Sequence, residues 1–271
     1  MTIRFWGVRG SIASPGEATR RTGGNTPCVE VSCGDDLVIL DAGTGLRQLG
    51  DRMMREGRRD ATLFLSHLHW DHIQGLPFYV PAYVPGHRLT LAGMRGLRGA
   101  LDGQMTPPCF PIGLDAMQAE LRFEEVGTAP VTVGGIEVRA AKLNHPGGVL
   151  AYRVSVGDRS VVYATDTEHY AVPDPHLVAL AKDADVLIYD AMYTEAEYPS
   201  KVGWGHSTWQ AGVAVANAAN VDRLVLFHHD PQRDDDAVDA IERAAATARP
   251  GTFAAREGES IRLSARERRA A

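Results

Sequence analysis

Cysteine is scarce in this chain, and the few cysteines present form no recognisable site. The 271 residues include three of them, Cys28, Cys33 and Cys109, with no CxxC pair. An odd number without a paired spacing argues against a disulfide framework, and small buried thiols are the simpler interpretation. If the chain binds a metal, we expect histidine and aspartate to hold it.

Long hydrophobic runs and an N-terminal targeting signal are also missing. No stretch reaches the roughly 18 apolar residues that a membrane helix needs, and the first residues lack the basic start and apolar stretch of a secretory signal. We therefore expect a cytoplasmic protein without membrane contact. The formal net charge of −6 argues against a broad surface for binding polyanions.

Two common motifs of nucleotide and metal chemistry are absent as well. The glycine-containing segment 43–50 has neither the G-x-G-x-x-G spacing nor a following Lys-Ser or Lys-Thr pair. The helical zinc motif His-Glu-x-x-His does not occur. A nucleotide-cofactor loop and a metalloprotease helix are therefore both excluded.

Short apolar runs bounded by glycine, proline and aspartate predict strands in both halves of the chain. These runs are 3–8, 28–31, 37–40 and 61–66 in the first half, and 131–133, 136–140, 150–154, 160–164, 186–189, 224–227 and 260–263 in the second. Helices are expected near 46–56, 208–219 and 234–247. Residues 76–120 are expected to supply a helix, a strand and an extended loop, and the charged tail 264–271 is expected to fray. No low-complexity linker divides the chain, so we predict a single domain over residues 1–271 with two sheets packed face to face between helical layers.

One run of six residues carries the strongest chemical signal. His67-Leu68-His69-Trp70-Asp71-His72 places four residues that can bind a metal, three histidines and one aspartate, directly after the predicted strand 61–66. If the chain is still extended there, His67 and His69 lie on one side, while a helix starting near Asp71 would aim the other two differently. Imidazole and carboxylate suit zinc and similar divalent ions. The alternative is a polar loop with surface histidines, and it does not explain why four of six residues are metal-ligand residues.

Further ligand types stand at the ends of later predicted strands. His145 lies in a turn, Asp166 and Asp190 follow the strands 160–164 and 186–189, and His228 and His229 follow 224–227. Each alone is more often a cap or a hydrogen-bonded core group. Together with the six-residue run, they are typical of a site at the rim of a sheet.

This pattern resembles the metallo-β-lactamase superfamily in its binuclear hydrolase form. The likeness spans nearly the whole chain and implies an α/β fold, a four-layer αβ/βα sandwich with the site at one edge of its two sheets. Asp41 before Gly43-Thr44-Gly45 matches the superfamily's early structural aspartate. The resemblance implies one ion on His67, His69 and His145, and a second on Asp71, His72 and His228, with Asp166 bridging. His228 is preferred over His229 as the late ligand because it directly follows the strand, and His229 could instead line the pocket.

The segment Gly205-His206-Ser207-Thr208 resembles the His-Ser-Thr loop of ribonuclease Z and related phosphodiesterases. The resemblance implies that Asp190 orients His206. A hydroxide bridging two cations would attack phosphorus, with Asp71 part of the catalytic centre. The leaving alkoxide then needs a proton, which a histidine held by a carboxylate can supply. The plainer interpretation makes His206 a helix-start residue, with Ser207 or Thr208 as the cap, and both can hold together.

Segments near the start and middle of the chain bear on the substrate. The segments 7–11, 23–28 and 107–111 resemble those of a branch of bacterial enzymes. That branch is itself compared with cyclic-nucleotide phosphodiesterases and with the cyclic-phosphate hydrolases of phosphonate breakdown. Arg9, Asn25 and His229 are candidate substrate contacts, alongside Ser11 and Thr26. The competing interpretation is that the glycines make turns that Asn25 caps.

We therefore predict a dinuclear metal-dependent phosphodiesterase that hydrolyses a small cyclic nucleotide or sugar phosphodiester, with His206 as general acid. Two zinc ions are the expected cofactors, and manganese, iron or cobalt would also fit. The alternatives are a ribonuclease Z-like nuclease and a thioester or lactone hydrolase on the same metal site. A non-catalytic nucleotide sensor is the third class, and the full ligand set argues against it. Extended nucleic acid is a less favoured partner than a small phosphodiester, and a homodimer is left open.

Overall fold

The computed structural model describes residues 1–265, so most of the tail that we expected to fray, 266–271, lies outside the described residues. The described chain folds into two seven-stranded sheets. Their strand orders are β14-β1-β2-β3-β4-β5-β6 and β13-β12-β11-β10-β9-β8-β7. The predicted sandwich is confirmed, with each sheet drawing its strands mainly from one half of the chain.

The first sheet is built mainly from the N-terminal half. Its strands are β1 (Thr2–Gly7), β2 (Cys28–Cys33), β3 (Asp36–Leu40), β4 (Asp60–Phe64), β5 (Arg88–Gly93), β6 (Glu120–Glu125) and β14 (Ser260–Arg262). The helical segments of this half are α1 (Gly45–Glu56), α2 (Trp70–Ile73) and α3 (Leu97–Gln104), with 3-10 turns at Glu17–Thr19, Leu76–Phe78, Val80–Tyr83 and Leu114–Ala116. The short β14 pairs antiparallel with β1 and so returns the end of the chain to its start.

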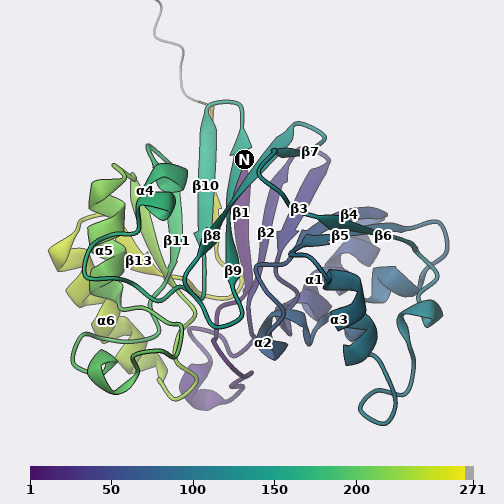
Figure 1. Cartoon of the computed structure of the whole chain (residues 1–271), viewed down its shortest axis with the longest axis horizontal. Coiled ribbons are helices and arrows are strands. Elements are labelled where there is room, and N and C mark those ends of the chain that lie inside the picture. The colour runs from purple at the N-terminus through teal and green to yellow at the C-terminus, as the bar shows by residue number, and fades with distance from the viewer. Residues whose placement is uncertain (266–271) are drawn as a thin grey trace, which may run out of the picture.

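The second sheet uses β7 (Val131–Val133), β8 (Ile136–Leu143), β9 (Val149–Val156), β10 (Arg159–Ala164), β11 (Val186–Asp190), β12 (Arg223–Phe227) and β13 (Thr252–Ala254). Its helices are α4 (Pro175–Ala181), α5 (Trp209–Ala218) and α6 (Asp235–Ala248), with a 3-10 turn at Tyr198–Ser200. Figure 1 shows α4, α5 and α6 on one outer side, α1 and α3 on the other, and the sheets between them. Among the described residues, none of the helices is long and apolar enough to cross a bilayer.

Alternation along the strands explains why the sheets are sandwiched. In β3, Val38 and Leu40 point into the core between the sheets, whereas Leu37 and Ile39 face the outer core. A strand buried on both faces reads as a continuous apolar run, which is why this segment was predicted correctly. The core between the sheets draws residues from both halves of the chain. That shared core supports the single domain over residues 1–271, which stays a prediction.

Several elements were missed by the sequence analysis. The strands β6 and β13 and the helix α4 were not predicted, and the strand predicted at 61–66 ends at Phe64. β6 alternates half-buried with exposed residues at the edge of its sheet, and β13 has only three residues. Such short or edge segments bury too little apolar surface to leave a pattern in the sequence.

The strand directions decide where the site can form. β3 to β6 run parallel, as do β10 to β13. The carboxyl ends of parallel strands meet at one edge of their sheet. The chain leaves β3 at Asp41, β10 at Thr165 and Asp166, and β12 at His228, and α2 lies beyond this edge at the foot of the strands in Figure 1.

Candidate metal centre

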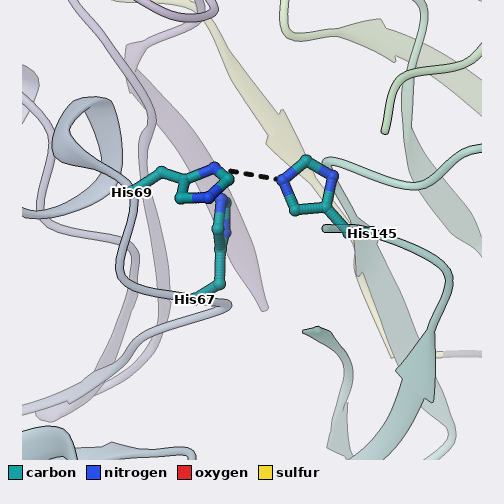
Figure 2. A group of neighbouring side chains, drawn as sticks. All are labelled: His67, His69 and His145. Atoms are coloured by element: carbon teal, nitrogen blue, oxygen red, sulfur yellow. Dashed lines mark hydrogen bonds between the residues drawn. The ribbon is translucent and has the colours of Figure 1, made fainter. Parts of the chain in front are cut away.

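Three histidines form the first group of converging side chains, which we call the open group: His67, His69 and His145. One ligand atom from each lies within 4.8 Å of the others. Figure 2 shows His67 and His69 rising from one loop and His145 meeting them from the opposite side. His69 Nδ1 and His145 Nε2 are 3.1 Å apart. His69 is exposed while the other two are buried, so this group faces solvent on one side.

Four residues form the second group, which we call the buried group: Asp71, His72, Asp166 and His228. Their ligand atoms also lie within 4.8 Å of one another, and all four residues are buried. Asp166 Oδ2 lies 3.1 Å from His72 Nε2 and 3.2 Å from His228 Nε2. Its other oxygen, Oδ1, lies 3.8 Å from His67 Nε2 and 4.0 Å from His145 Nε2. Asp166 therefore stands between the two groups.

The hydrogen bonds around His72 indicate that a cation belongs here. His72 Nδ1 is 2.7 Å from Asp41 Oδ2, so Nδ1 carries the proton and donates it to the carboxylate. In the neutral ring, Nε2 then presents a lone pair, yet it faces the carboxylate oxygens of Asp71 and Asp166 and has no hydrogen-bond partner. His67 Nε2 is likewise buried without a partner. Buried polar atoms without partners are rare, and divalent ions between these atoms would satisfy them.

Outer hydrogen bonds fix the orientation of several ligands. Asp41 accepts from the Ser66 backbone N–H at 2.7 Å, from Ser66 Oγ at 2.8 Å and from the Tyr163 hydroxyl at 2.7 Å. His145 Nδ1 donates to the carbonyl of Gly205 at 2.8 Å. Such contacts set the tautomer and ring orientation of metal-binding histidines. Ser66 and Tyr163 were missed by the sequence analysis, and only the position of Ser66 directly before His67 could have pointed to one of them.

The backbone at the site is held in an uncommon conformation. Asp41, Asp166 and His228 have φ of 64°, 50° and 59°, and Ser11 has 62°. This left-handed region is costly for residues other than glycine and is retained where the surrounding structure imposes it. Ser11 uses it to donate its backbone N–H to Asp71 Oδ2 at 2.8 Å. Four of the six described non-glycine residues with positive φ therefore lie at the site.

The electrostatics favour metal-binding protonation states at His67 and Asp166. At His72, burial would lower the pKa, but the carboxylates of Asp71 and Asp166 outweigh it and raise that pKa well above its usual value. Burial, followed by the neighbouring His72, lowers the pKa of His67 well below its usual value, so this ring is neutral. Burial would raise the pKa of Asp166, but His228 and His72 outweigh it and hold that pKa well below its usual range. Neutral imidazole and ionised carboxylate are the forms that coordinate metals.

His206 lies beside both groups, and its ligand atom is within 4.8 Å of ligand atoms of Asp166, Asp190 and His228. Its Nδ1 is 2.9 Å from Asp190 Oδ2 and 3.7 Å from Asp166 Oδ1, and its ring stacks on His228 with centroids 5.0 Å apart. Burial lowers the pKa of His206, but Asp190 and then Asp166 reverse this and raise it to about 9. The carboxylate of Asp190 therefore favours the protonated form of the His206 ring. Thr208, two residues on, caps α5 by accepting from the Ala211 N–H at 3.2 Å, so the cap and the contact to Asp190 coexist.

The three candidate substrate residues have other partners. The buried guanidinium of Arg9 donates to the backbone carbonyls of Gly23, Asp230 and Arg233. These bonds connect neighbouring loops of the fold.

Asn25 and His229 also make contacts within the fold. Asn25 Nδ2 donates to Glu257 Oε2 at 3.0 Å. His229 is buried, and its Nε2 is 3.0 Å from the carbonyl oxygen of Ala255. His229 is in neither ligand group, and the substrate contacts suggested by the sequence for these residues stay a prediction.

Comparison with known proteins agrees with the fold. The sequence profile of the beta-lactamase superfamily domain matches residues 37–229. A curated relative, ribonuclease Z of Haloarcula marismortui, is 26% identical, with the alignment covering 84% of this chain and 86% of the relative.

Solved structures show the same architecture. The metallo-beta-lactamase fold protein YhfI from Bacillus subtilis superposes with a TM-score of 0.75 at 20% identity, covering 96% of this chain and 98% of that one. A structure described as a new diphosphatase from the PhnP family gives a TM-score of 0.73 at 19% identity, covering 97% and 98%. At these identities the likeness extends to the fold.

Proposed function

Because the chain belongs to the beta-lactamase superfamily and is a metal-dependent hydrolase, we propose that it is a dinuclear phosphodiesterase acting on a small, cyclic nucleotide or sugar phosphodiester. The observation that carries the proposal is the pair His206–Asp190, set 3.7 Å from the shared carboxylate of Asp166. A histidine held by a carboxylate beside two clusters of metal ligands is suited to a reaction whose leaving group needs a proton.

The proposed ligand assignment follows the two groups. The open group would hold one ion and the buried group the other, with Asp166 shared between them. Zinc is the proposed native ion because imidazole and carboxylate ligands suit it, although manganese, iron and cobalt accept the same set. When bound, the ions would activate a water molecule as nucleophile and offset the charge on the phosphoryl oxygens.

The side chains around the ions have separate tasks. His206 would give its proton to the leaving alkoxide, because Asp190 stabilises the charged ring. Asp190 holds Nδ1, so it also fixes the plane of the ring. Asp41 and the Gly205 carbonyl hold His72 and His145 so that their Nε2 atoms face the ligand cluster.

A second candidate is favoured by the sequence relatives. Ribonuclease Z proteins match most of this chain, which supports hydrolysis of an RNA phosphodiester on the same ligand set. The net charge of −6 favours a small substrate over a polymer, because neutralising phosphates along a polymer takes many lysine and arginine contacts.

A turnover screen on metal-analysed protein separates these candidates. The panel contains bis(p-nitrophenyl) phosphate, 2′,3′- and 3′,5′-cyclic nucleotides, a thioester and a precursor tRNA. We expect turnover of a cyclic nucleotide and no salt-sensitive RNA binding. Tight RNA binding at low salt with cleavage of the tRNA would favour the nuclease, and activity on the thioester alone would refute the proposal.

The His206→Ala variant tests the acid. Loss of a general acid costs roughly 10²–10⁴-fold in rate, so kcat on the cyclic nucleotide should fall within that range. The loss on bis(p-nitrophenyl) phosphate should be smaller, because p-nitrophenolate leaves without a proton. His176→Ala, an exposed histidine on α4, is the matched control. Equal losses on both substrates would rule out the acid role.

A further inference from the structure

The loop between β11 and α5 carries two elements of the site on neighbouring residues. Gly205 supplies the carbonyl that accepts from His145, and His206 follows it directly. Gly203 and Gly205 both have φ of 86°. A side chain at Gly205 would place its Cβ 2.2 Å from His145 Nδ1, so the loop backbone lies directly against the ligand histidine. The path of this loop therefore sets the position of both histidines.

A single carboxylate from another loop holds that path. Glu168, two residues after Asp166, accepts at Oε1 from the Tyr198 hydroxyl at 2.8 Å and from the Gly203 N–H at 2.6 Å. Its other oxygen, Oε2, accepts from the Gly205 N–H at 3.0 Å. Glu168 is 8% exposed, so these bonds form largely away from solvent. No other described side chain accepts from the Gly203 or Gly205 N–H.

The backbone of Glu168 is tied to the third loop of the site. Its N–H donates to the carbonyl of Asn144 at 2.8 Å, and Asn144 Nδ2 donates back to the Glu168 carbonyl at 3.2 Å. Asn144 directly precedes His145. Glu168 therefore connects the segments that carry Asp166, His145 and His206.

We infer that Glu168 is a positioning residue that holds the ligand His145 and the acid His206 in register through the 203–206 loop. The link to His145 runs from the Glu168 carboxylate to the Gly205 N–H and from the Gly205 carbonyl to His145 Nδ1. The link to His206 is the same loop, one residue further on. The part of this inference that concerns His206 rests on the proposed function, whereas the part that concerns His145 rests on the ligand geometry alone.

The chemistry of the contact requires a carboxylate. Three donors converge on two oxygens, and both oxygens of a carboxylate accept. In glutamine, one oxygen becomes an NH₂ group that can only donate, so it would face a backbone N–H or the Tyr198 hydroxyl. At least one buried N–H would lose its acceptor. Glu168→Gln therefore disturbs the loop while keeping nearly the same shape.

Zinc competition tests the link to His145 without any substrate. Metal-free Glu168→Gln and wild-type protein are titrated with zinc alone against a chromogenic chelator, and each zinc affinity is read separately. Loss of an outer hydrogen-bond partner typically weakens metal affinity by about 10–100-fold. We expect a loss of that size for one of the two ions and little change for the other.

Two matched controls accompany this titration. Glu195→Gln removes an exposed carboxylate beyond β11, and Tyr198→Phe removes one of the three donors while leaving both backbone bonds. Both are expected to keep wild-type zinc affinity. If Glu168→Gln does not fold, Glu168→Asp draws the carboxylate back by one methylene, and the same loss is expected at a smaller size.

The leaving-group comparison tests the link to His206. At saturating zinc, the ratio of kcat on a cyclic nucleotide to kcat on bis(p-nitrophenyl) phosphate should fall in Glu168→Gln, because only the first substrate needs the proton. A residue that merely supports folding would lower thermal stability and leave both the zinc affinity and this ratio unchanged, and that result would overturn the inference. If the wild type hydrolyses no phosphodiester, the proposed function fails, and the zinc titration still decides the role of Glu168.

Discussion

The open and buried groups use similar ligands but are held in different ways. The buried group has all its members shielded from solvent, and Asp41 alone gathers four hydrogen bonds behind His72. In the open group, His69 is exposed, and His145 depends on one backbone carbonyl of a loop. The difference indicates that one side of the centre is fixed by the core of the sandwich, whereas the other is fixed by loops that meet only in the folded protein.

Loss of the shared carboxylate should have the largest effect. Asp166 stands between the groups, so Asp166→Ala removes a ligand atom from each. Because loss of even an outer partner costs about 10–100-fold, we expect turnover to fall by at least about a hundredfold and zinc content to drop below two ions per chain. Elemental analysis and kinetics measure both. Two tightly bound ions in the variant would show that the groups are independent of Asp166.

Disturbing the support of the buried group should come next. In Asp41→Asn, one carboxylate oxygen becomes an NH₂ group facing the donors of Ser66, Tyr163 or His72. We expect a loss of about 10–100-fold in one zinc affinity, together with about 1–3 kcal/mol of unfolding free energy for the unsatisfied buried group. Urea unfolding of the metal-free protein and zinc competition measure the two effects. A change in stability alone would mean that Asp41 supports the fold and not the ligand.

Chelation should separate the two groups in time. His69 is exposed, whereas all four members of the buried group are buried. A chelator should therefore remove the ion of the open group first and the ion of the buried group more slowly. Stopped-flow mixing with a chromogenic chelator should show two phases. His69→Ala is expected to abolish the fast phase only, and a single phase in the wild type would contradict the contrast between the groups.

Removing one of the hydrogen-bond donors to Asp41 should have the smallest effect. Tyr163→Phe deletes the hydroxyl that donates to Asp41 at 2.7 Å and leaves the other three donors in place. We expect a loss of about 1 kcal/mol of unfolding free energy with both zinc affinities retained. A large loss of zinc affinity in this variant would mean that all the hydrogen bonds to Asp41 are needed together to hold His72.

The sequence predicted the fold most reliably where strands are buried on both faces. The runs 37–40, 186–189 and 224–227 became β3, β11 and β12 with boundaries within one residue, because continuous apolar stretches of that length leave few alternatives. The edge strand β6 escaped notice because its exposed residues carry no such pattern. The burial of a strand on both faces, more than the strand propensity of its residues, decided whether it was predicted.

For the site, residue type and position at strand ends indicated which side chains to examine. The superfamily resemblance supplied their division into two sets. Nothing local marked the hydrogen bonds that Arg9 makes within the fold, because its three acceptor carbonyls lie 14 to 224 positions away in the chain. Glu168 was missed for the same reason, since its partners lie on a loop some 30 positions further along.

The sequence by itself therefore determined the two-sheet architecture, the run His67 to His72 and the types of ligand that accompany it, because these depend on local patterns of burial and on residue chemistry. The tertiary structure alone decided the distances at which Asp166 stands from the ligand atoms of both groups, and how the carboxylate of Glu168 on one loop holds another loop. The physical reason is that hydrogen bonds and ligand contacts depend on distances of a few ångströms between segments that the sequence separates, and parallel strands bring those segments together at one edge.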